Sequence, residues 1–287
     1  MKLGLFHFQL LYNVLENIHF IYDEEELADT VLTKISETLN AEAGTIFRID
    51  IDGTITPLAS YGAPLEKLKR TEFRVGKGVV GWVAQYVQPV KVDDPKKDAR
   101  FMGQADRTTG FQTRSIVAAP ILAKGKAIGV IEFLNRRDGS FNVPDLELIS
   151  MIGREVGIAF ENVSLVRKLT NSQAFLESMV NSLSAGLVVC DPDDRVIELN
   201  PRAMDIIGAS WAPTEPPRPA AEVLAKCPDM LSVLGKASAS DKPLTRQELP
   251  VKTVNGTLKV GWSGVPIKAK NGRRLGTAVL FQDITKL

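Results

Sequence analysis

The residue types that most often carry chemistry are few and unevenly placed in this 287-residue chain. Both histidines, His7 and His19, lie near the start, and both cysteines, Cys190 and Cys227, lie in the second half. A haem or zinc site, a Ser-His-Asp triad and a phosphoaccepting histidine all need a histidine that the sequence lacks after position 19. No GxxxxGK[ST] motif occurs, which excludes a P-loop. We therefore predict no catalytic centre and no metal site in this stretch of chain.

One carboxylate is unusual because of its neighbours. Two apolar segments, 116–122 and 128–134, read as strands of a hairpin whose turn is Lys124–Gly125–Lys126. Glu132 interrupts the second strand amid Val, Ile and Phe. Such a carboxylate lies either on the solvated face of an alternating strand or in a pocket, and the pattern leaves both alternatives open.

The elements that would position this hairpin follow from periodicity and turn residues. Acidic residues open a helix at the position where the helix dipole favours them. The segment 93–109, DDPKKDARFMGQADRTT, is polar and rich in turn residues, and we interpret it as a lid loop. The other elements expected in this half are helices over 4–22, 24–40 and 79–87 and strands over 45–50, 55–61 and 89–92.

One long helix is expected over 144–183, with Pro144 in its first turn. Residues spaced by seven along it predict a coiled coil of about three heptads. The alternative is an ordinary helix that packs on its own domain. A second domain is expected over 184–287, with strands at 186–190, 195–199, 244–253, 256–267 and 274–283 and helices at 200–208 and 220–236.

Composition narrows the class of protein. The net charge of +1 gives no field that would attract nucleic acid or an anionic membrane. No apolar run approaches the roughly 18 residues that a transmembrane helix needs. The first 22 residues have helical periodicity and no cleavage site, so we do not interpret them as a signal peptide. Two cysteines give no disulfide framework, and we expect a cytoplasmic protein.

Residues 20–165 resemble a GAF domain of the cyclic-nucleotide phosphodiesterase type. The resemblance lies in the order of GKGVVGWVAQYVQPVKVDD, the lid, TGFQTRSIVAAPI and AIGVIEFLNR. Those domains carry an Asn-Lys, spacer, Phe, three residues, Asp-Glu motif, and here Asn135-Arg136, Phe141 and Asp145-Leu146 stand in its place. The Lys is replaced by Arg and the final Glu is lost. The resemblance implies that Arg136 and Asp145 form a pair that braces the region over the pocket.

The resemblance also implies a ligand pocket that holds a cyclic nucleotide or another small molecule. Asp106 and Glu132 would accept hydrogen bonds from a purine base, and Thr109 and Thr113 would contact the base or the phosphate. Met102 falls where those domains have an aromatic residue. The alternative is an empty domain that serves only the fold. The positions that match ligand contacts are Thr45, Tyr61, Val79, Val80, Met102, Asp106, Thr109, Thr113 and Glu132.

Residues 172–287 resemble a PAS domain through GLVVCDPDDRVIELNPRAMDIIG and GRRLGTAVLFQDIT. A haem-binding His and the flavin-type Asn-Cys-Arg-Phe-Leu stretch are missing, and no Cys before position 190 could attach a bilin. We therefore expect no haem, flavin or bilin. The expected fold is α+β, with a GAF domain over 1–165 and a PAS domain over 184–287. Each would be an antiparallel sheet flanked by helices, joined by the helix over 144–183.

Together the two resemblances imply the sensory region of a bacterial signal-transduction protein, such as a sensor histidine kinase. The chain stops soon after the Asp-Ile-Thr end of the PAS pattern, so we expect a further effector, a histidine kinase before a diguanylate cyclase or a transcriptional activator. A homodimer would form through the N-terminal and connecting helices. The alternative function is a ligand-free scaffold for dimerisation or protein interaction.

Overall fold

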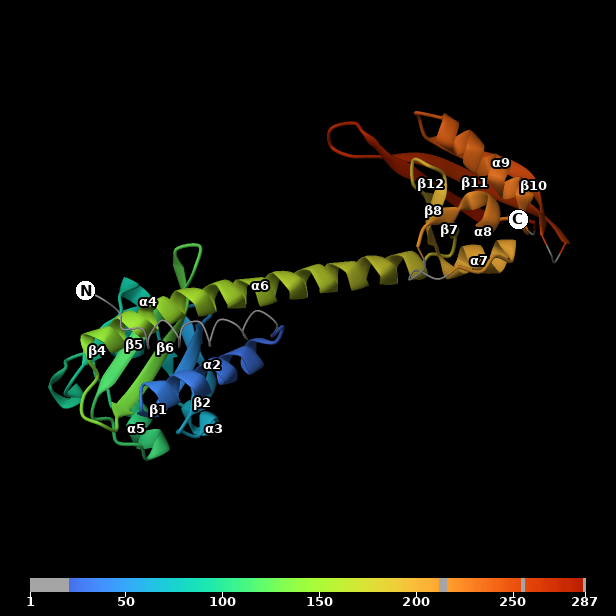
Figure 1. Ribbon diagram of the computed structural model, residues 1–287. Helices are drawn as coiled ribbons and strands as arrows, with labels where there is room; N and C mark the ends of the chain where they lie inside the picture. Colours follow the sequence, from blue (N-terminus) through green and yellow to red (C-terminus); the bar gives the residue numbers. More distant parts are fainter. Residues whose placement is uncertain (1–20, 212–215, 254–255, 286–287) are drawn as a thin grey trace. The chain divides into compact units, whose positions relative to one another are not determined.

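The computed structural model describes residues 21–211, 216–253 and 256–285. The chain divides into two compact units, Met1–Thr170 and Asn171–Leu287. The prediction of an α+β fold with two antiparallel sheets and a long helix between them is confirmed (Figure 1). The helix predicted over 4–22 falls almost entirely outside the described residues. Within the described residues, no helix combines the length and the apolar character needed to cross a membrane.

The first unit is built on one antiparallel sheet, which has six strands in the order β3-β2-β1-β6-β5-β4 within the described residues. Its strands are β1 (Ala41–Ile49), β2 (Thr54–Tyr61), β3 (Phe73–Arg74), β4 (Val90–Val92), β5 (Ile116–Ala123) and β6 (Lys126–Arg136). Its helices are α2 (Glu24–Thr38), α3 (Leu65–Leu68), α4 (Gly78–Tyr86), the 3-10 turn η1 (Pro95–Lys97), α5 (Gln104–Thr109) and the start of α6 (Val143–Asn181).

Strand alternation divides this sheet into two faces. In β6, Ile131 and Phe133 belong to the core that α2 and α6 cover. Val130 and Leu134 lie on the opposite face, packed with residues of α4. Because successive side chains of a strand point to opposite faces, Glu132 shares the α4 face with its two apolar neighbours. The sheet is therefore covered on both sides, and Glu132 places an acid on the α4 face.

Helix α6 packs closely on the first sheet in its first half. A methyl group on Gly157 would lie 2.0 Å from the carbonyl oxygen of Leu122, so only glycine permits this approach to β5. Ile152 and Ala159, which are seven residues apart and so belong to the predicted heptad spacing, are buried in this core. The first half of α6 therefore packs on its own domain, which was the alternative to a coiled coil. Further along, Leu169 and Leu176 are 70% and 58% exposed.

The second unit has a sheet that, within the described residues, runs β10-β11-β12-β7-β8-β9. Asn200 ties its elements together: its Oδ1 accepts from the Leu187 and Ala203 amides, and its Nδ2 donates to the Val180 and Ala185 carbonyls. The strands are β7 (Gly186–Cys190), β8 (Arg195–Leu199), β9 (Arg218–Pro219), β10 (Leu244–Thr253), β11 (Gly256–Lys268) and β12 (Arg274–Asp283). The helices are α7 (Pro201–Ile207), α8 (Ala220–Val223) and α9 (Pro228–Ala239).

Two segments differ from the prediction. The lid segment 93–109 is not a plain loop, because it contains η1 and the short helix α5. The single helix predicted over 220–236 is two helices, α8 and α9. Cys227 precedes Pro228 with φ −141°, outside the helical region, and proline then occupies the first turn of α9. Both cysteines are buried, and burial raises the pKa of the Cys190 thiol to about 12, as expected for an inert packing residue.

Candidate ligand pocket

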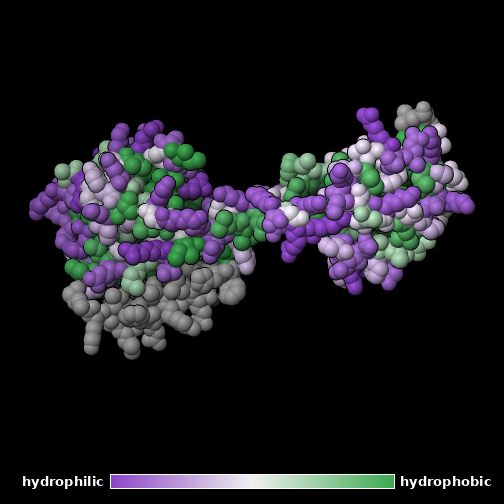
Figure 2. Space-filling model, turned by 90° about the horizontal axis from the view of Figure 1, so that it is seen from above, coloured by the Kyte–Doolittle hydropathy of each residue, from purple (hydrophilic) through white to green (hydrophobic). Residues whose placement is uncertain are grey.

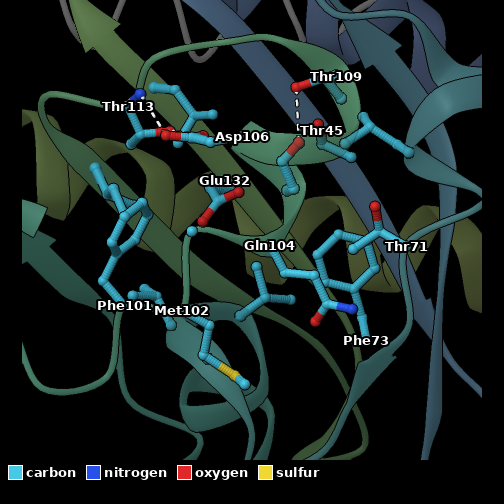
Figure 3. Close-up of a pocket in the computed structure, with 18 of the residues that line it drawn as sticks. Thr45, Thr71, Phe73, Phe101, Met102, Gln104, Asp106, Thr109, Thr113 and Glu132 are labelled. Atoms are coloured by element: carbon cyan, nitrogen blue, oxygen red, sulfur yellow. Dashed lines mark hydrogen bonds between the residues drawn. The ribbon is translucent and has the colours of Figure 1, made fainter.

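A cavity of about 160 Å³ lies on the α4 face of the first sheet. Its floor comes from β1, β5 and β6, and α4 and α5 contribute walls (Figure 3). Eight of the nine residues predicted to contact a ligand line it. They are Thr45, Val79, Val80, Met102, Asp106, Thr109, Thr113 and Glu132. The fold thus brings together residues that are separated by up to about ninety positions in the sequence.

Tyr61 is not among the residues that line the pocket. The register of the β1–β2 pair explains this, because Thr45 lies opposite Ser60 and Tyr61 lies opposite Gly44. Cross-strand partners share a face, so Tyr61 points to the face opposite Thr45. There it packs against the core that α2 and α6 cover.

Glu132 sits at the centre of the cavity, opposite Thr45 of β1 and Ala118 of β5 in the sheet register (Figure 3). Its side chain is only 9% exposed, and among the described residues the structure gives its carboxylate no hydrogen-bond or ion-pair partner. Burial, with a smaller contribution from the nearby Asp106 carboxylate, raises the pKa of Glu132 to about 8. Glu132 therefore lies in a pocket and not on a solvated face of the strand.

The lid helix α5 is fastened to the strand entrance by one carboxylate. Asp106 accepts from the Thr113 amide at 2.9 Å and from the Thr113 hydroxyl at 2.6 Å. Thr109 is also engaged, because its hydroxyl donates to the Ala105 carbonyl at 2.8 Å. These hydrogen bonds hold α5 against the strand entrance, so a ligand that needed Asp106 or Thr113 directly would have to share or displace them.

Sequence reasoning missed the aromatic part of the lining. Phe73, Phe101 and Phe111 all contribute to the cavity, and Phe101 is the immediate neighbour of Met102, which is itself 53% exposed. The signal that could have found Phe101 was an aromatic residue one position from the expected one. Thr71 was also missed, and its hydroxyl is buried without a partner in the described part of the chain.

The opposite end of the cavity is suited to an anion. Helix α4 begins at Gly78 after Lys77, with no side-chain oxygen capping its first turn, and Val79 and Val80 of that turn line the pocket. Free amides at a helix N-terminus, together with the helix dipole, favour a phosphate or carboxylate. Arg74 and Lys77 also line the cavity, and Glu72, another lining residue, pairs with Arg74 at 2.6 Å and offsets its charge.

The Arg136–Asp145 ion pair joins the end of β6 to the start of α6. Asp145 also accepts from the Asn142 amide at 2.8 Å, and its own amide donates to the Asn142 side chain at 2.9 Å. Its side chain is 6% exposed and that of Arg136 is 24% exposed. The pair predicted from the motif is therefore present in the structure, next to the strand that carries Glu132.

A metal site does not emerge from this geometry. In residues 21–211, 216–253 and 256–285, no three His, Cys, Asp or Glu side chains come together in a way that could hold a metal ion. The pocket instead offers an unpaired acid, a helix N-terminus and aromatic side chains, which is the chemistry of an organic ligand site.

Comparison with known families agrees with the two units. Residues 23–160 match the family model of the GAF domain, and residues 180–287 match that of the PAS fold. A probable 3',5'-cyclic phosphodiesterase of Caenorhabditis elegans is 29% identical over 145 residues, which are 49% of this chain and 20% of that protein. A dual 3',5'-cyclic-AMP and -GMP phosphodiesterase 11A of Takifugu rubripes is 33% identical over 158 residues, 53% of this chain and 16% of that protein.

The chain therefore spans a fifth or less of the length of these relatives. Among solved structures, the GAF domain of a phosphoenolpyruvate-protein phosphotransferase from Coxiella burnetii matches with a TM-score of 0.52 and 15% identity. The match covers 56% of this chain and 96% of that one, and at this identity it shows the fold alone. The chain thus contains two sensory domains, a GAF domain at residues 23–160 followed by a PAS fold at residues 180–287.

Proposed function

We propose that this chain is a sensory input module whose GAF pocket binds a small molecule, with a cyclic nucleotide as the first candidate. The observation that carries the proposal is the acid of Glu132, which is 9% exposed, lines the cavity and has no hydrogen-bond or ion-pair partner among the described residues. A buried polar group without a partner costs free energy, and a ligand that pairs with it recovers part of that cost.

A cyclic nucleotide suits the distribution of groups in the cavity. Its phosphate would meet the N-terminus of α4 beside Arg74 and Lys77, and its base would meet Glu132 and the aromatic side chains. The similar proteins named above act on 3',5'-cyclic nucleotides according to their names. Likeness to them supports the same ligand class in this chain.

We also propose that the signal passes from the lid to α6. Asp106 holds the lid to Thr113, β6 carries Glu132, and Arg136 at the end of β6 holds Asp145 at the start of α6. A ligand that binds the closed lid more tightly than the open one would bias this helix. In a cytoplasmic homodimer, α6 would then pass the bias to the PAS domain and to an effector, which we expect to be a histidine kinase.

A thermal-shift titration with cyclic AMP, cyclic GMP and other purines tests the ligand proposal. A ligand that binds only the folded GAF domain at 100 times its Kd adds about 2.7 kcal/mol of stability, so its melting temperature must rise. Asp106→Ala and Glu132→Ala should abolish the shift, whereas Glu37→Ala, an exposed glutamate on α2, should keep it. Equal shifts in all variants would refute the pocket assignment.

One observation favours the second candidate, a dimerisation scaffold. The second half of α6 leaves Leu165, Leu169 and Leu176 more than half exposed, and hydrophobic surface lies beside hydrophilic surface there (Figure 2). Light scattering should show a dimer that Leu169→Glu weakens and that Lys168→Glu, an exposed neighbour, does not. A dimer that no purine stabilises would support the scaffold, and a monomer would refute the dimeric relay.

A further inference from the structure

If the pocket binds a nucleotide, as proposed above, the protonation state of Glu132 affects which base it accepts. We propose that Glu132 acts in the pocket as a neutral carboxylic acid and selects a planar head group with a hydrogen-bond acceptor beside a donor, as on the edge of adenine. Loss of the proton would leave only acceptors, which match two adjacent donors such as N1–H and the amino N–H of guanine and no longer match adenine.

The surroundings of Glu132 disfavour its ionised form. The cations that line the cavity lie at its rim: Arg74 pairs with Glu72 at 2.6 Å, and Lys77 is exposed. Neither forms an ion pair with Glu132 in the structure. Of the other acids that line the cavity, Glu72 is paired with Arg74, whereas Asp106 on α5 adds negative charge near Glu132. Desolvation without a cation, next to a second carboxylate, is the arrangement that keeps a proton on an acid.

The sheet gives Glu132 no compensating partner. Its cross-strand neighbours on β1 and β5 are Thr45 and Ala118, and Val130 and Leu134 flank it on its own face. Val79 and Val80 close the cavity from α4. These groups are uncharged and do not stabilise an ionised Glu132. This agrees with the pKa of Glu132, which burial and Asp106 raise to about 8. At neutral pH the neutral acid is then the main form.

The neutral and ionised forms of Glu132 form hydrogen bonds with different partners. A neutral carboxylic acid offers one O–H donor and one carbonyl acceptor, whereas a carboxylate offers only acceptors. The edge of adenine presents the ring N1 as acceptor beside the amino N–H donor, which matches the neutral acid. The edge of guanine presents the acceptor O6, then N1–H and the amino N–H, so guanine can pair with the neutral acid through O6 and N1–H or with the carboxylate through its two donors. A mismatch leaves a buried polar group unpaired, and such sites discriminate strongly.

The remaining lining suits a planar group. Phe73 and Phe101 line the same cavity as Glu132 (Figure 3). The Thr71 hydroxyl, which is buried without a partner in the described part of the chain, adds one more group that a ring substituent can satisfy. Aromatic walls with a few placed polar groups are typical of sites for flat heterocycles.

Isothermal titration calorimetry with cyclic AMP and cyclic GMP at pH 6.5 and 8.5 tests the proposal. With a pKa of about 8, the neutral fraction of Glu132 falls about fourfold between these pH values, and only adenine depends on the neutral form. The affinity for cyclic AMP relative to cyclic GMP should therefore fall by about fourfold or more. The sign follows from loss of the proton as pH rises. Both bases stay largely uncharged over this range, so the change reports on the protein.

Glu132→Gln is the decisive variant, because an amide always offers one donor and one acceptor. Its ratio of affinities for cyclic AMP and cyclic GMP should be the same at both pH values. Glu37→Gln, at an exposed position of α2, should show the pH dependence of the unmodified chain. Thermal unfolding of each variant without ligand verifies that it folds, and Glu132→Asp, which shortens the acid but keeps its proton, is a second titrating variant if the amide destabilises the domain.

The outcomes separate this inference from the proposed function. A selectivity in the unmodified chain that does not shift towards cyclic GMP as pH rises overturns the inference and leaves nucleotide binding standing. The same holds if Glu132→Gln keeps the full pH dependence. Failure of both nucleotides to bind at either pH overturns the inference and the cyclic-nucleotide proposal together.

Discussion

Replacing Asp145 by alanine tests whether the ion pair at the start of α6 holds the GAF domain together. The change removes a carboxylate whose side chain is 6% exposed and leaves the guanidinium of Arg136, 24% exposed, without its partner. It also removes the acceptor of the Asn142 amide. Breaking a buried pair costs about 3–5 kcal/mol. Because Arg136 retains some contact with water, we expect the lower end, about 3 kcal/mol.

Hydrogen exchange of the amides in β6 and the first turns of α6 measures this loss within the GAF domain alone, whatever the PAS domain does. For a unit of this size, 3 kcal/mol corresponds to a fall in melting temperature of about 6–12 °C. In a double-mutant cycle, Arg136→Ala and Asp145→Ala should show a coupling of at least about 1 kcal/mol, because the two side chains are in contact.

The matched control is an exposed pair in the same domain. Lys69 and Glu66 lie 3.1 Å apart, and their side chains are 44% and 80% exposed. Solvent screens such pairs, so Glu66→Ala should cost less than about 1 kcal/mol. If Asp145→Ala costs no more than this control, or if the two changes in the cycle simply add, the pair does not brace the domain and our reasoning is wrong.

Three further predictions concern the pocket and the helix. The pKa of Glu132 rises from 4.5 to about 8 on folding, so its contribution to stability is present below pH 4.5 and is lost as pH rises towards 8. Melting temperatures measured from pH 5 to 8 should therefore fall less in Glu132→Gln than in the unmodified chain. Gly157→Ala should destabilise the GAF domain by about 1–3 kcal/mol in urea unfolding because its methyl group meets β5, whereas Asn162→Ala should stay within about 0.5 kcal/mol. Asp106→Ala should speed proteolysis within residues 93–109, and equal rates in this variant and in Arg107→Ala would refute the lid fastening.

Secondary structure followed closely from the sequence in the hairpins and in the long helix. The polar turn at Lys124–Lys126 separates β5 from β6, and the helix expected over 144–183 is α6, Val143–Asn181. Local periodicity and turn residues are sufficient for such elements. The break at Pro228 carried a local signal as well, because proline starts helices more readily than it continues them.

The resemblance to GAF domains predicted a set of pocket residues. Because the resemblance compares only the order of residues along the chain, the set contained one wrong residue and lacked another. It included Tyr61, which the β1–β2 register turns to the other face. It missed Phe101, one position from the residue that the motif indicated. A motif matched in one dimension does not show strand register, and a shift of one residue moves a side chain across the sheet.

Alternation in β6 was enough to place Glu132 on one face with Val130 and Leu134. It could not show what covers that face. The cover consists of α4 and α5, which lie far earlier in the chain, and their packing makes the difference between a solvated carboxylate and one that is 9% exposed. Sequence pattern alone thus determined the strands, the helices and the sharing of faces, because these are local properties of the backbone. Only the tertiary structure decided burial, and with it the proton affinity of Glu132, because desolvation depends on groups distant in sequence.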